Sequence, residues 1–365
     1  MVLTDASRIM TEALVQSGAD VFIGYPITPS NLFYAYSKER FPEFLAGPDE
    51  ISVLQWMCGY SAAGKIPVTA TSFPGLALMT ETLNMAYMME LPMVLVIVQR
   101  LGPSTGSATT GAQGDLKFLD GIISGGLPLP IFSPSDFKDS WNLANEAVKT
   151  AVEFRTPVIL LTSKEMVMTQ KGFDINLLKA LNRVNNPIKN FEPPYQPYKA
   201  GEDMVPPFVP LGNEELQARF NASTHDNDGL IRKGTPESLA NTWRLREKLE
   251  KRIDEFFFYE LDAENGATNL IVSWGITADA SRDAVQTIRK KGNKISLLIV
   301  KTILPISSKI YEIIDSYEKV LFAEENMTGL YKEMIFGKRN NSKVKTATKF
   351  GGMLTPSEIE KMLFN

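Results

Sequence analysis

The stretch MVLVIVQRLGPSTG, residues 93–106, decides the fold and indicates where the site lies. Residues 93–98 are uninterrupted apolar, which is typical of a strand buried on both faces of a parallel sheet. Arg100 comes just after this run and is followed by Gly-Pro-Ser-Thr-Gly. Ligands of open α/β sheets bind at the carboxyl ends of the strands. The stretch therefore predicts a loop that binds an anionic ligand at the edge of an α/β sheet.

The same alternation of helix and strand patterns extends through residues 1–165. Apolar residues spaced three and four apart predict helices, and short apolar runs predict strands. The expected helices span 51–61, 76–87 and 136–154, and the expected strands span 21–23, 68–70, 93–98, 131–132 and 158–161. This order predicts a doubly wound α/β domain.

The composition changes between about residues 190 and 268. The segments EPPYQPY and VPPFVP predict an extended connector wrapped on a surface, with a charged helix over 237–256. Alternation then returns, with strands at 270–273, 295–300 and 320–323 and helices at 279–291 and 329–336. We expect a first domain over 1–190, a proline-rich connector over 191–267 and a smaller α/β domain over 268–365.

Composition and charge exclude several classes of protein. The 365 residues are 44% hydrophobic and carry a net charge of −4, so no bulk attraction for nucleic acid or an anionic membrane is expected. No apolar run approaches the roughly 18 to 20 residues of a membrane span, and the start MVLTDASRIM does not resemble a signal peptide. A cytoplasmic protein is expected.

The chain has one cysteine, Cys58, and one histidine, His225. A disulfide framework, a structural zinc site and a cysteine-ligated iron-sulfur cluster each need several such residues from one chain. A Ser-His-Asp triad would have to use His225, which lies in a polar segment far from the glycine-rich loops. We expect no metal in this chain, so its chemistry must come from carboxylates, arginine, hydroxyls or a cofactor.

Three segments hold the candidate site residues. Arg100 must find an anion, which either Asp115 or a substrate carboxylate could supply. Asp49-Glu50 is either an acidic helix start or a carboxylate that acts on a cofactor proton. Thr71 and Ser72 offer hydroxyls at a strand-to-helix joint, although most such joints only connect two elements.

A second proline-containing loop, GYPITPS at 24–30, follows a strand. Its two prolines fix the backbone and remove two donors, so the loop is rigid. A structural turn would explain both prolines but would not require the threonine between them. The residues concerned are Tyr25, Pro26, Ile27, Thr28 and Pro29.

Taken together, these motifs resemble the α subunits of the 2-oxoacid:ferredoxin oxidoreductases, which include 2-oxoglutarate synthase and pyruvate:ferredoxin oxidoreductase. The resemblance covers nearly the whole chain. The matching motifs are YPITPS at 25–30, DEI at 49–51, TATS…PG…LM…E at 69–81, ELP at 90–92, QR-GPSTG…Q-DL at 99–116, THDNDG at 224–229, EEN-TG at 324–329 and FGGMLTPSEI at 350–359. The family implies a pyrimidine-binding domain followed by a transketolase-C-like domain, and an organising role for His225.

The resemblance also implies roles for individual residues. Glu50 would bond the aminopyrimidine nitrogen of thiamine diphosphate and favour the tautomer that deprotonates the thiazolium carbon. Arg100 would clamp the oxoacid carboxylate, and Thr28 would bond the substrate or coenzyme A. Ser72 is a further substrate candidate, and the loop 25–29 is associated with coenzyme A approach. The reaction implied is oxidative decarboxylation of 2-oxoglutarate or a related 2-oxoacid to acyl-CoA, or its reverse.

The family further implies a division of labour between subunits. A β subunit would carry the diphosphate and Mg²⁺ site and an iron-sulfur cluster, which agrees with the absence of a GDG motif here. A separate γ subunit, a ferredoxin-like δ subunit and ferredoxin are the other expected partners. The activity would then require the β subunit.

The chain departs from the family pattern at a few positions, which bear on its substrate. Phe73 stands where glycine is usual and could enter a pocket or pack against the partner. Ala112 replaces an acidic residue, and Ser107-Ala108 replaces longer side chains. Two alternatives therefore stay open: a non-redox thiamine diphosphate decarboxylase or transketolase-like component, and a catalytically silent assembly subunit.

Overall fold

The computed structural model describes residues 1–186, 191, 193–339 and 341–364. Its larger sheet has seven strands in the order β12-β6-β7-β5-β4-β2-β3, all parallel except the edge strand β12. These strands are β2 (Val21–Gly24), β3 (Glu43–Ala46), β4 (Pro67–Thr71), β5 (Met93–Gln99), β6 (Ile131–Phe132), β7 (Pro157–Ser163) and β12 (Thr302–Leu304). Every residue of β4, β5 and β7 is buried, as their apolar runs predict.

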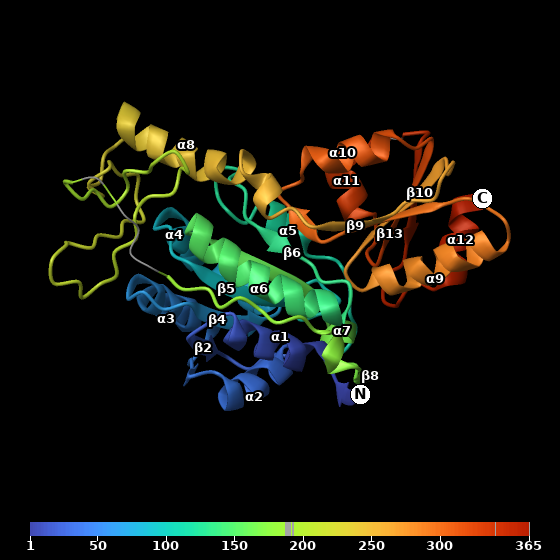
Figure 1. Ribbon diagram of the computed structural model, residues 1–365, viewed down its shortest axis with the longest axis horizontal. Coiled ribbons are helices and arrows are strands. Elements are labelled where there is room, and N and C mark those ends of the chain that lie inside the picture. The colour runs from blue at the N-terminus through green and yellow to red at the C-terminus, as the bar shows by residue number, and fades with distance from the viewer. Residues whose placement is uncertain (187–190, 192, 340, 365) are drawn as a thin grey trace.

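Helices cover both faces of this sheet (Figure 1). On one face α1 (Ala6–Gln16) packs between α2 (Asn31–Arg40) and α6 (Phe137–Phe154), and on the other α3 (Glu50–Ala62) packs against α4 (Phe73–Met88). The shorter helices α5 (Leu116–Asp120) and α7 (Lys164–Met168) follow β5 and β7, and β1 (Val2–Thr4) pairs with β8 (Lys171–Phe173) in a separate ribbon. The expected doubly wound domain is confirmed.

The second domain, to the right in Figure 1, is a five-stranded sheet in the order β14-β13-β10-β11-β9. Helices α9 and α12 lie against one of its faces and α10 and α11 lie near the other (Figure 1). Its elements are β9 (Tyr259–Asp262), β10 (Asn269–Trp274), α9 (Thr277–Lys290), β11 (Ser296–Val300), α10 (Ser308–Asp315), β13 (Lys319–Glu324), α11 (Leu330–Phe336), β14 (Val344–Thr348) and α12 (Pro356–Phe364). One apolar core runs from the first sheet into this domain.

The connector differs from expectation in two respects. Its helix α8 (Pro236–Glu250) ends earlier than predicted, and a separate 3-10 turn spans Ile253–Glu255. The segment 205–209 is buried rather than wrapped on a surface, because Arg155 donates hydrogen bonds to the carbonyls of Pro206 and Pro207 at 3.2 and 2.8 Å. The proposed boundary after residue 190 adjoins residues 187–190, which lie outside the described part, as does residue 192 of EPPYQPY.

A strand exchange ties the two domains together. After β11 the chain leaves the second sheet, and the next strand, β12, pairs antiparallel with β6 at the edge of the first sheet. The backbone of Ser133, just past β6, also donates to the carbonyl of Lys301 at 2.7 Å. Backbone hydrogen bonds therefore cross the domain interface.

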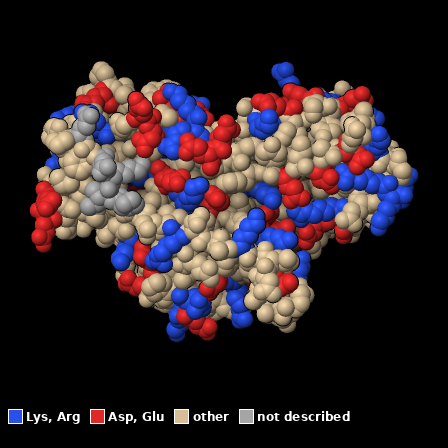
Figure 2. Space-filling view, viewed as in Figure 1, with Lys and Arg blue, Asp and Glu red and all other residues tan. Residues whose placement is uncertain are grey.

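Charged side chains of both signs are interspersed over the face of the molecule in Figure 2, without a large field of one sign. No described helix combines the length and the apolar character that a bilayer span requires.

Candidate active site

The candidate site lies where the carboxyl ends of β5, β4, β2 and β3 meet at one edge of the first sheet. From β2 the chain passes to β3 on one side and then returns to β4 on the other. The switch point of the sheet is therefore between β2 and β4, which is where ligands of such sheets bind. Each of the four strands leads into one of the segments singled out in the sequence.

The loop after β2 is anchored to its neighbours. The backbone N–H of Ser30 donates to the carbonyl of Ile27 at 2.9 Å, and the Ser30 hydroxyl lies 3.5 Å from the carbonyl of Ala70 at the end of β4. Tyr25 and Pro26 are exposed, Ile27 and Thr28 are half-buried, and Pro29 is buried. The loop thus presents Tyr25 and Pro26 to solvent and keeps Thr28 half-buried.

Arg100 follows β5 and is only 5% exposed. Its Nη1 donates to the carbonyl of Thr28 at 2.5 Å, which joins two of the predicted site residues. Its Nε is sealed from solvent and has no hydrogen-bond partner in the described chain. Among the described residues Arg100 Nε and Asp115 Oδ2 are both without a hydrogen-bond partner, so the guanidinium retains a donor for an anion.

Asp115 nevertheless acts on Arg100 electrostatically. Burial raises the pKa of Asp115 to about 7, while the positive charge of Arg100 lowers it. Burial also lowers the pKa of Arg100, and Asp115 raises it. The two groups therefore form an incompletely paired, buried set of charges at the end of β5.

Glu50 is the first residue of α3, and Asp49 is its N-cap. The Asp49 carboxylate accepts a hydrogen bond from the backbone of Ser52 at 2.7 Å. Because Asp49 satisfies the helix start, Glu50 is not needed there. Glu50 is 7% exposed, accepts no hydrogen bond from the described residues, and its carboxylate is not sealed from solvent. It is available to a ligand.

Gly75, in the first turn of α4, lies directly against Glu50. A Cβ at Gly75 would lie 2.1 Å from the hydroxyl of Thr71 and 2.9 Å from Oε1 of Glu50. Only glycine fits this position, so the Pro-Gly pair of the strand-to-helix joint makes room for the carboxylate.

The start of α4 contributes two further features. The hydroxyl of Ser72 is buried and finds no partner within the described chain, so it is a candidate ligand group. The ring of Phe73 packs edge to face on Phe118 of α5, with ring centroids 5.2 Å apart. Phe73 therefore packs within its own chain.

Sequence reasoning did not assign a role to Gln113, which links the two domains. Its Oε1 accepts from the Thr277 hydroxyl and from the backbone of Glu325, both at 2.8 Å, and its Nε2 donates to the carbonyl of Trp274 at 2.8 Å. Asn326 donates to its carbonyl at 3.2 Å. The loop that begins at Arg100 is thereby fixed to the second domain.

A buried charge cluster at the opposite end of β5 was also missed. Glu90 is fully buried, and it pairs with Lys248 at 2.6 Å and with Arg244 at 2.5 Å, both on α8. Arg155 donates to the carbonyl of Glu90 at 3.2 Å. The cations hold the pKa of Glu90 far below its usual value against the effect of burial. This cluster fixes the connector helix to the first domain.

His225 is 1% exposed and lies within the connector. Its ring packs on Tyr198 with centroids 3.8 Å apart, and its Nδ1 is 2.7 Å from the carbonyl of Ser223. The side chain of Asn241 donates to the backbone carbonyl of His225 at 3.2 Å. Burial lowers the pKa of His225. These contacts agree with the organising role that the resemblance implies.

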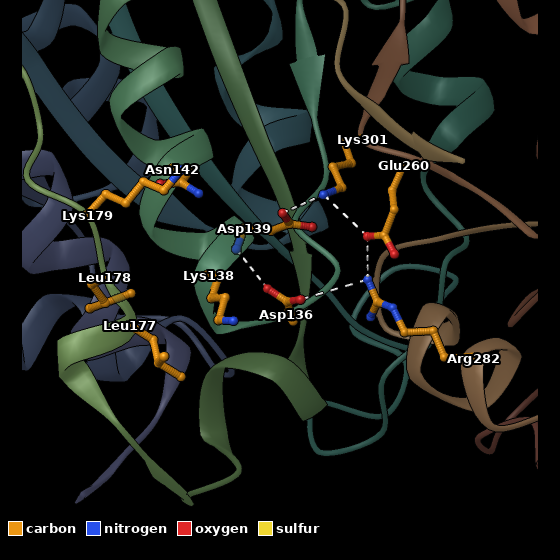
Figure 3. A pocket seen from close by; sticks show the side chains of 10 residues that line it. All are labelled: Asp136, Lys138, Asp139, Asn142, Leu177, Leu178, Lys179, Glu260, Arg282 and Lys301. Carbon is orange, nitrogen blue, oxygen red and sulfur yellow. Dashed lines mark hydrogen bonds and ion pairs between the residues drawn. The ribbon is translucent and has the colours of Figure 1, made fainter. Parts of the chain in front are cut away.

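A hollow of about 430 Å³ between the domains is lined by charges that pair with one another (Figure 3). Lys301 pairs with Asp139 at 2.7 Å, and Arg282 pairs with Glu260 at 3.0 Å. These ion pairs link the two domains across the hollow. Over the described residues no group of three or more His, Cys, Asp or Glu side chains is arranged to hold a metal.

Comparisons with known proteins show the family of the chain. Residues 12–242 match the family described as pyruvate flavodoxin/ferredoxin oxidoreductase, thiamine diP-binding. The chain is 29% identical to the 2-oxoglutarate synthase subunit KorA of Methanocaldococcus jannaschii, over 97% of each chain. It is also 29% identical to the 2-oxoglutarate oxidoreductase subunit KorA of Mycobacterium tuberculosis, of which it spans half the length.

Two solved structures resemble the chain. The 2-oxoglutarate:ferredoxin oxidoreductase of Magnetococcus marinus, solved with 2-oxoglutarate, coenzyme A and succinyl-CoA bound, superposes with a TM-score of 0.90 at 27% identity. That match covers 99% of this chain and 64% of the other. A split-gene transketolase shares only the fold, with a TM-score of 0.59 at 15% identity. The chain belongs to the thiamine diphosphate-binding pyruvate flavodoxin/ferredoxin oxidoreductase family, as an α-type subunit.

Proposed function

We propose that this chain is the α subunit of a 2-oxoglutarate:ferredoxin oxidoreductase that acts only with a β subunit. The observation that carries the proposal is the Glu50 carboxylate, which is almost buried, has no partner in the described chain and has space reserved for it by Gly75. The names of relatives such as 2-oxoglutarate synthase support the choice of oxoacid.

The residues present fit the pyrimidine half of thiamine diphosphate. When bound, this cofactor stabilises the carbanion that remains after decarboxylation. Glu50 would accept a hydrogen bond from the pyrimidine nitrogen, a bond that an amide cannot replace because it cannot carry the negative charge. The buried Ser72 hydroxyl, which has no hydrogen-bond partner in the described chain, would make a second polar contact with the cofactor.

Substrate binding is assigned to the end of β5 and the loop after β2. Arg100 would bind the oxoacid carboxylate with the donors that Thr28 leaves free. Thr28 would orient either the oxoacid or coenzyme A, and the exposed residues Tyr25 and Pro26 would lie on the side from which coenzyme A approaches.

The outer face of α3 and α4 supports a β-subunit partner at this site. Glu81 is the only charged residue in α4, and α3 carries none after Glu50. On this face Ile51, Trp56 and Leu78 are 43, 40 and 52% exposed. Helices that are apolar nearly all round are normally buried on all sides. A β subunit docked here would adjoin Glu50 and complete the cofactor site.

A γ subunit and a ferredoxin-like δ subunit are further proposed partners. Relatives near twice the length of the match, such as the M. tuberculosis subunit, support additional domains in the assembled enzyme. Mass spectrometry of the complex purified through this chain tests which of them copurify.

The test of function uses the chain coexpressed with its β subunit. The complex should reduce methyl viologen when 2-oxoglutarate and coenzyme A are both present, whereas a non-redox decarboxylase would release CO₂ without reducing the dye. Glu50→Gln should leave assembly intact, nearly abolish turnover and slow exchange of the thiazolium proton. Normal exchange in this variant would make Glu50 only an acidic helix start.

Docking has its own matched pair of variants. Leu78→Asp should prevent copurification with the β subunit, because it places a charge on the apolar face of α4. Leu177→Asp, at a leucine of equal exposure elsewhere on the chain, should not. Loss of the complex in both variants would contradict the assignment of this face.

A further inference from the structure

Asp115 is a buried carboxylate without a structural partner. It is 8% exposed and precedes α5, but its side chain makes no capping hydrogen bond to that helix. Its Oδ2 is sealed from solvent and finds no donor in the described chain. Burying an unpaired carboxylate is costly, so a group that serves only the fold would be expected to have a partner.

The backbone of Asp115 is tied to the strand that leads to Arg100. Its N–H lies 3.4 Å from the side-chain oxygen of Gln99, the last residue of β5. Within the intervening loop, Leu101 donates to the carbonyl of Thr110 at 2.7 Å and accepts from Ser107 at 2.9 Å. These hydrogen bonds hold the loop closed and place the backbone of Asp115 beside the end of β5, where Arg100 follows.

Arg100 is the charged group that acts on Asp115. Lys117, on the same short helix, pairs instead with Glu333 of α11, which packs against α5. Arg100 in turn has a buried Nε with no acceptor in the part of the chain described here. An unpaired buried donor and an unpaired buried acceptor thus lie at one end of one strand.

We propose that Asp115 is a positioning residue for Arg100: a buried counter-ion with which the carboxylate of the oxoacid competes for the guanidinium. The inference rests on the proposed function and adds to it a residue that sets the affinity of the site. With no oxoacid bound, ionised Asp115 offsets the charge of Arg100. When Asp115 is protonated, Arg100 offers its full charge to the oxoacid.

The direction of the pH dependence follows. The pKa of Asp115 is raised to about 7, so this carboxylate ionises as the pH rises from 6 to 8. Ionised Asp115 weakens the binding of a second carboxylate to Arg100. The KM for the oxoacid should therefore rise over this interval, whereas the KM for coenzyme A should not.

The test measures methyl viologen reduction by the α–β complex from pH 6 to 8. Asp115→Asn keeps the size of the side chain but cannot ionise. At pH 8 it should lower the KM for 2-oxoglutarate by about threefold to tenfold, with kcat little changed, and the KM should no longer vary with pH. Asp120→Asn, at an exposed carboxylate on the same helix, is the matched control and should behave like the wild type.

Three outcomes would overturn the proposal. The first is an Asp115→Asn enzyme that keeps the KM and pH profile of the wild type, and the second is one that loses kcat at unchanged KM. The third needs no variant: a wild-type KM for 2-oxoglutarate that does not rise between pH 6 and 8. In each of these three cases, dye reduction by the wild-type complex would still support the proposed function. A wild-type complex that reduces no dye with any 2-oxoacid removes both.

Discussion

Gly75→Ala tests whether the start of α4 is shaped around Glu50. The added methyl would lie 2.1 Å from the hydroxyl of Thr71 and 2.8 and 2.9 Å from Cγ and Oε1 of Glu50. Real contacts are not this short, so something must move. Thr71 is a β-branched residue fixed in a buried strand, whereas the Glu50 carboxylate is the free end of a longer side chain. Most of the displacement should fall on Glu50.

The magnitudes separate the effect on stability from the effect on catalysis. Overpacking lowers the free energy of unfolding by about 1–3 kcal/mol, and replacing a helical glycine by alanine raises it by about 1 kcal/mol. The net loss in free energy of unfolding should therefore be only about 1 kcal/mol. A catalytic group displaced by about 1 Å can lower the rate by about a hundredfold. Turnover should fall far more than stability.

The assays are urea unfolding of the full chain and dye-linked turnover of the α–β complex. Gly59→Ala is the matched control for the unfolding assay, because Gly59 is a helical glycine in α3 whose added Cβ would meet no heavy atom within 4 Å beyond its chain neighbours and the backbone of its own helix. That variant should be more stable than the wild type by about 0.5–1 kcal/mol. If Gly75→Ala gains stability in the same way and keeps full turnover, the reasoning about Glu50 is refuted.

Three further substitutions test the features that support the site. Gln113→Ala should remove the link between the Arg100 loop and the second domain, which hydrogen exchange would detect as faster exchange of the loop amides. Glu90→Gln should lower the free energy of unfolding by about 3–5 kcal/mol, because it leaves buried cations uncompensated. Because the pKa of Glu90 is lowered in the folded state, ionised Glu90 stabilises the fold above pH 4.5. This stabilisation is lost as the pH falls. Burial raises the pKa of Glu325 to about 7. The contribution of Glu325 to the free energy of unfolding is therefore full below pH 4.5 and is lost as the pH rises through 7. Glu325→Gln should flatten this decline, as measured by urea unfolding.

Exposed carboxylates supply the controls for the last two. Glu250→Gln lies on α8 but on its exposed side, and Glu318→Gln lies just before β13. Each should change the free energy of unfolding by less than about 0.5 kcal/mol. Equal losses in Glu90→Gln and Glu250→Gln, or equal pH slopes in Glu325→Gln and Glu318→Gln, would contradict the assigned roles.

The sequence predicted the first domain well because its signals are local. The apolar run at 93–98 has the length and the β-branched content of a buried strand, and Asp49 marked the start of the helix that carries Glu50. The motifs at 25–30 and 99–116 were expected to meet because they immediately follow strands, and parallel strands bring their carboxyl ends to one edge. The contact between Arg100 and Thr28 fulfils that expectation.

What the sequence did not reveal depends on contacts between distant residues. Glu90 was part of a recognised motif, but its partners Arg244 and Lys248 come 154 and 158 residues later. Gln113 finds Thr277 and Glu325 across 164 and 212 residues. β3 has an apolar run of only three residues and β9 has none, and both strands are partly exposed, so periodicity did not detect them. Such pairings are fixed by the assembled fold rather than by local pattern.

The exchange of β12 into the first sheet bears on how this protein can be divided. A fragment cut after residue 190 would keep β6 but lose its edge partner β12, so the two residues of β6 would become an open edge of the sheet. Bare sheet edges of this kind recruit other chains and aggregate. The first 190 residues should therefore be insoluble when expressed alone, and only a polypeptide that includes residues 302–304 should yield a well-behaved protein.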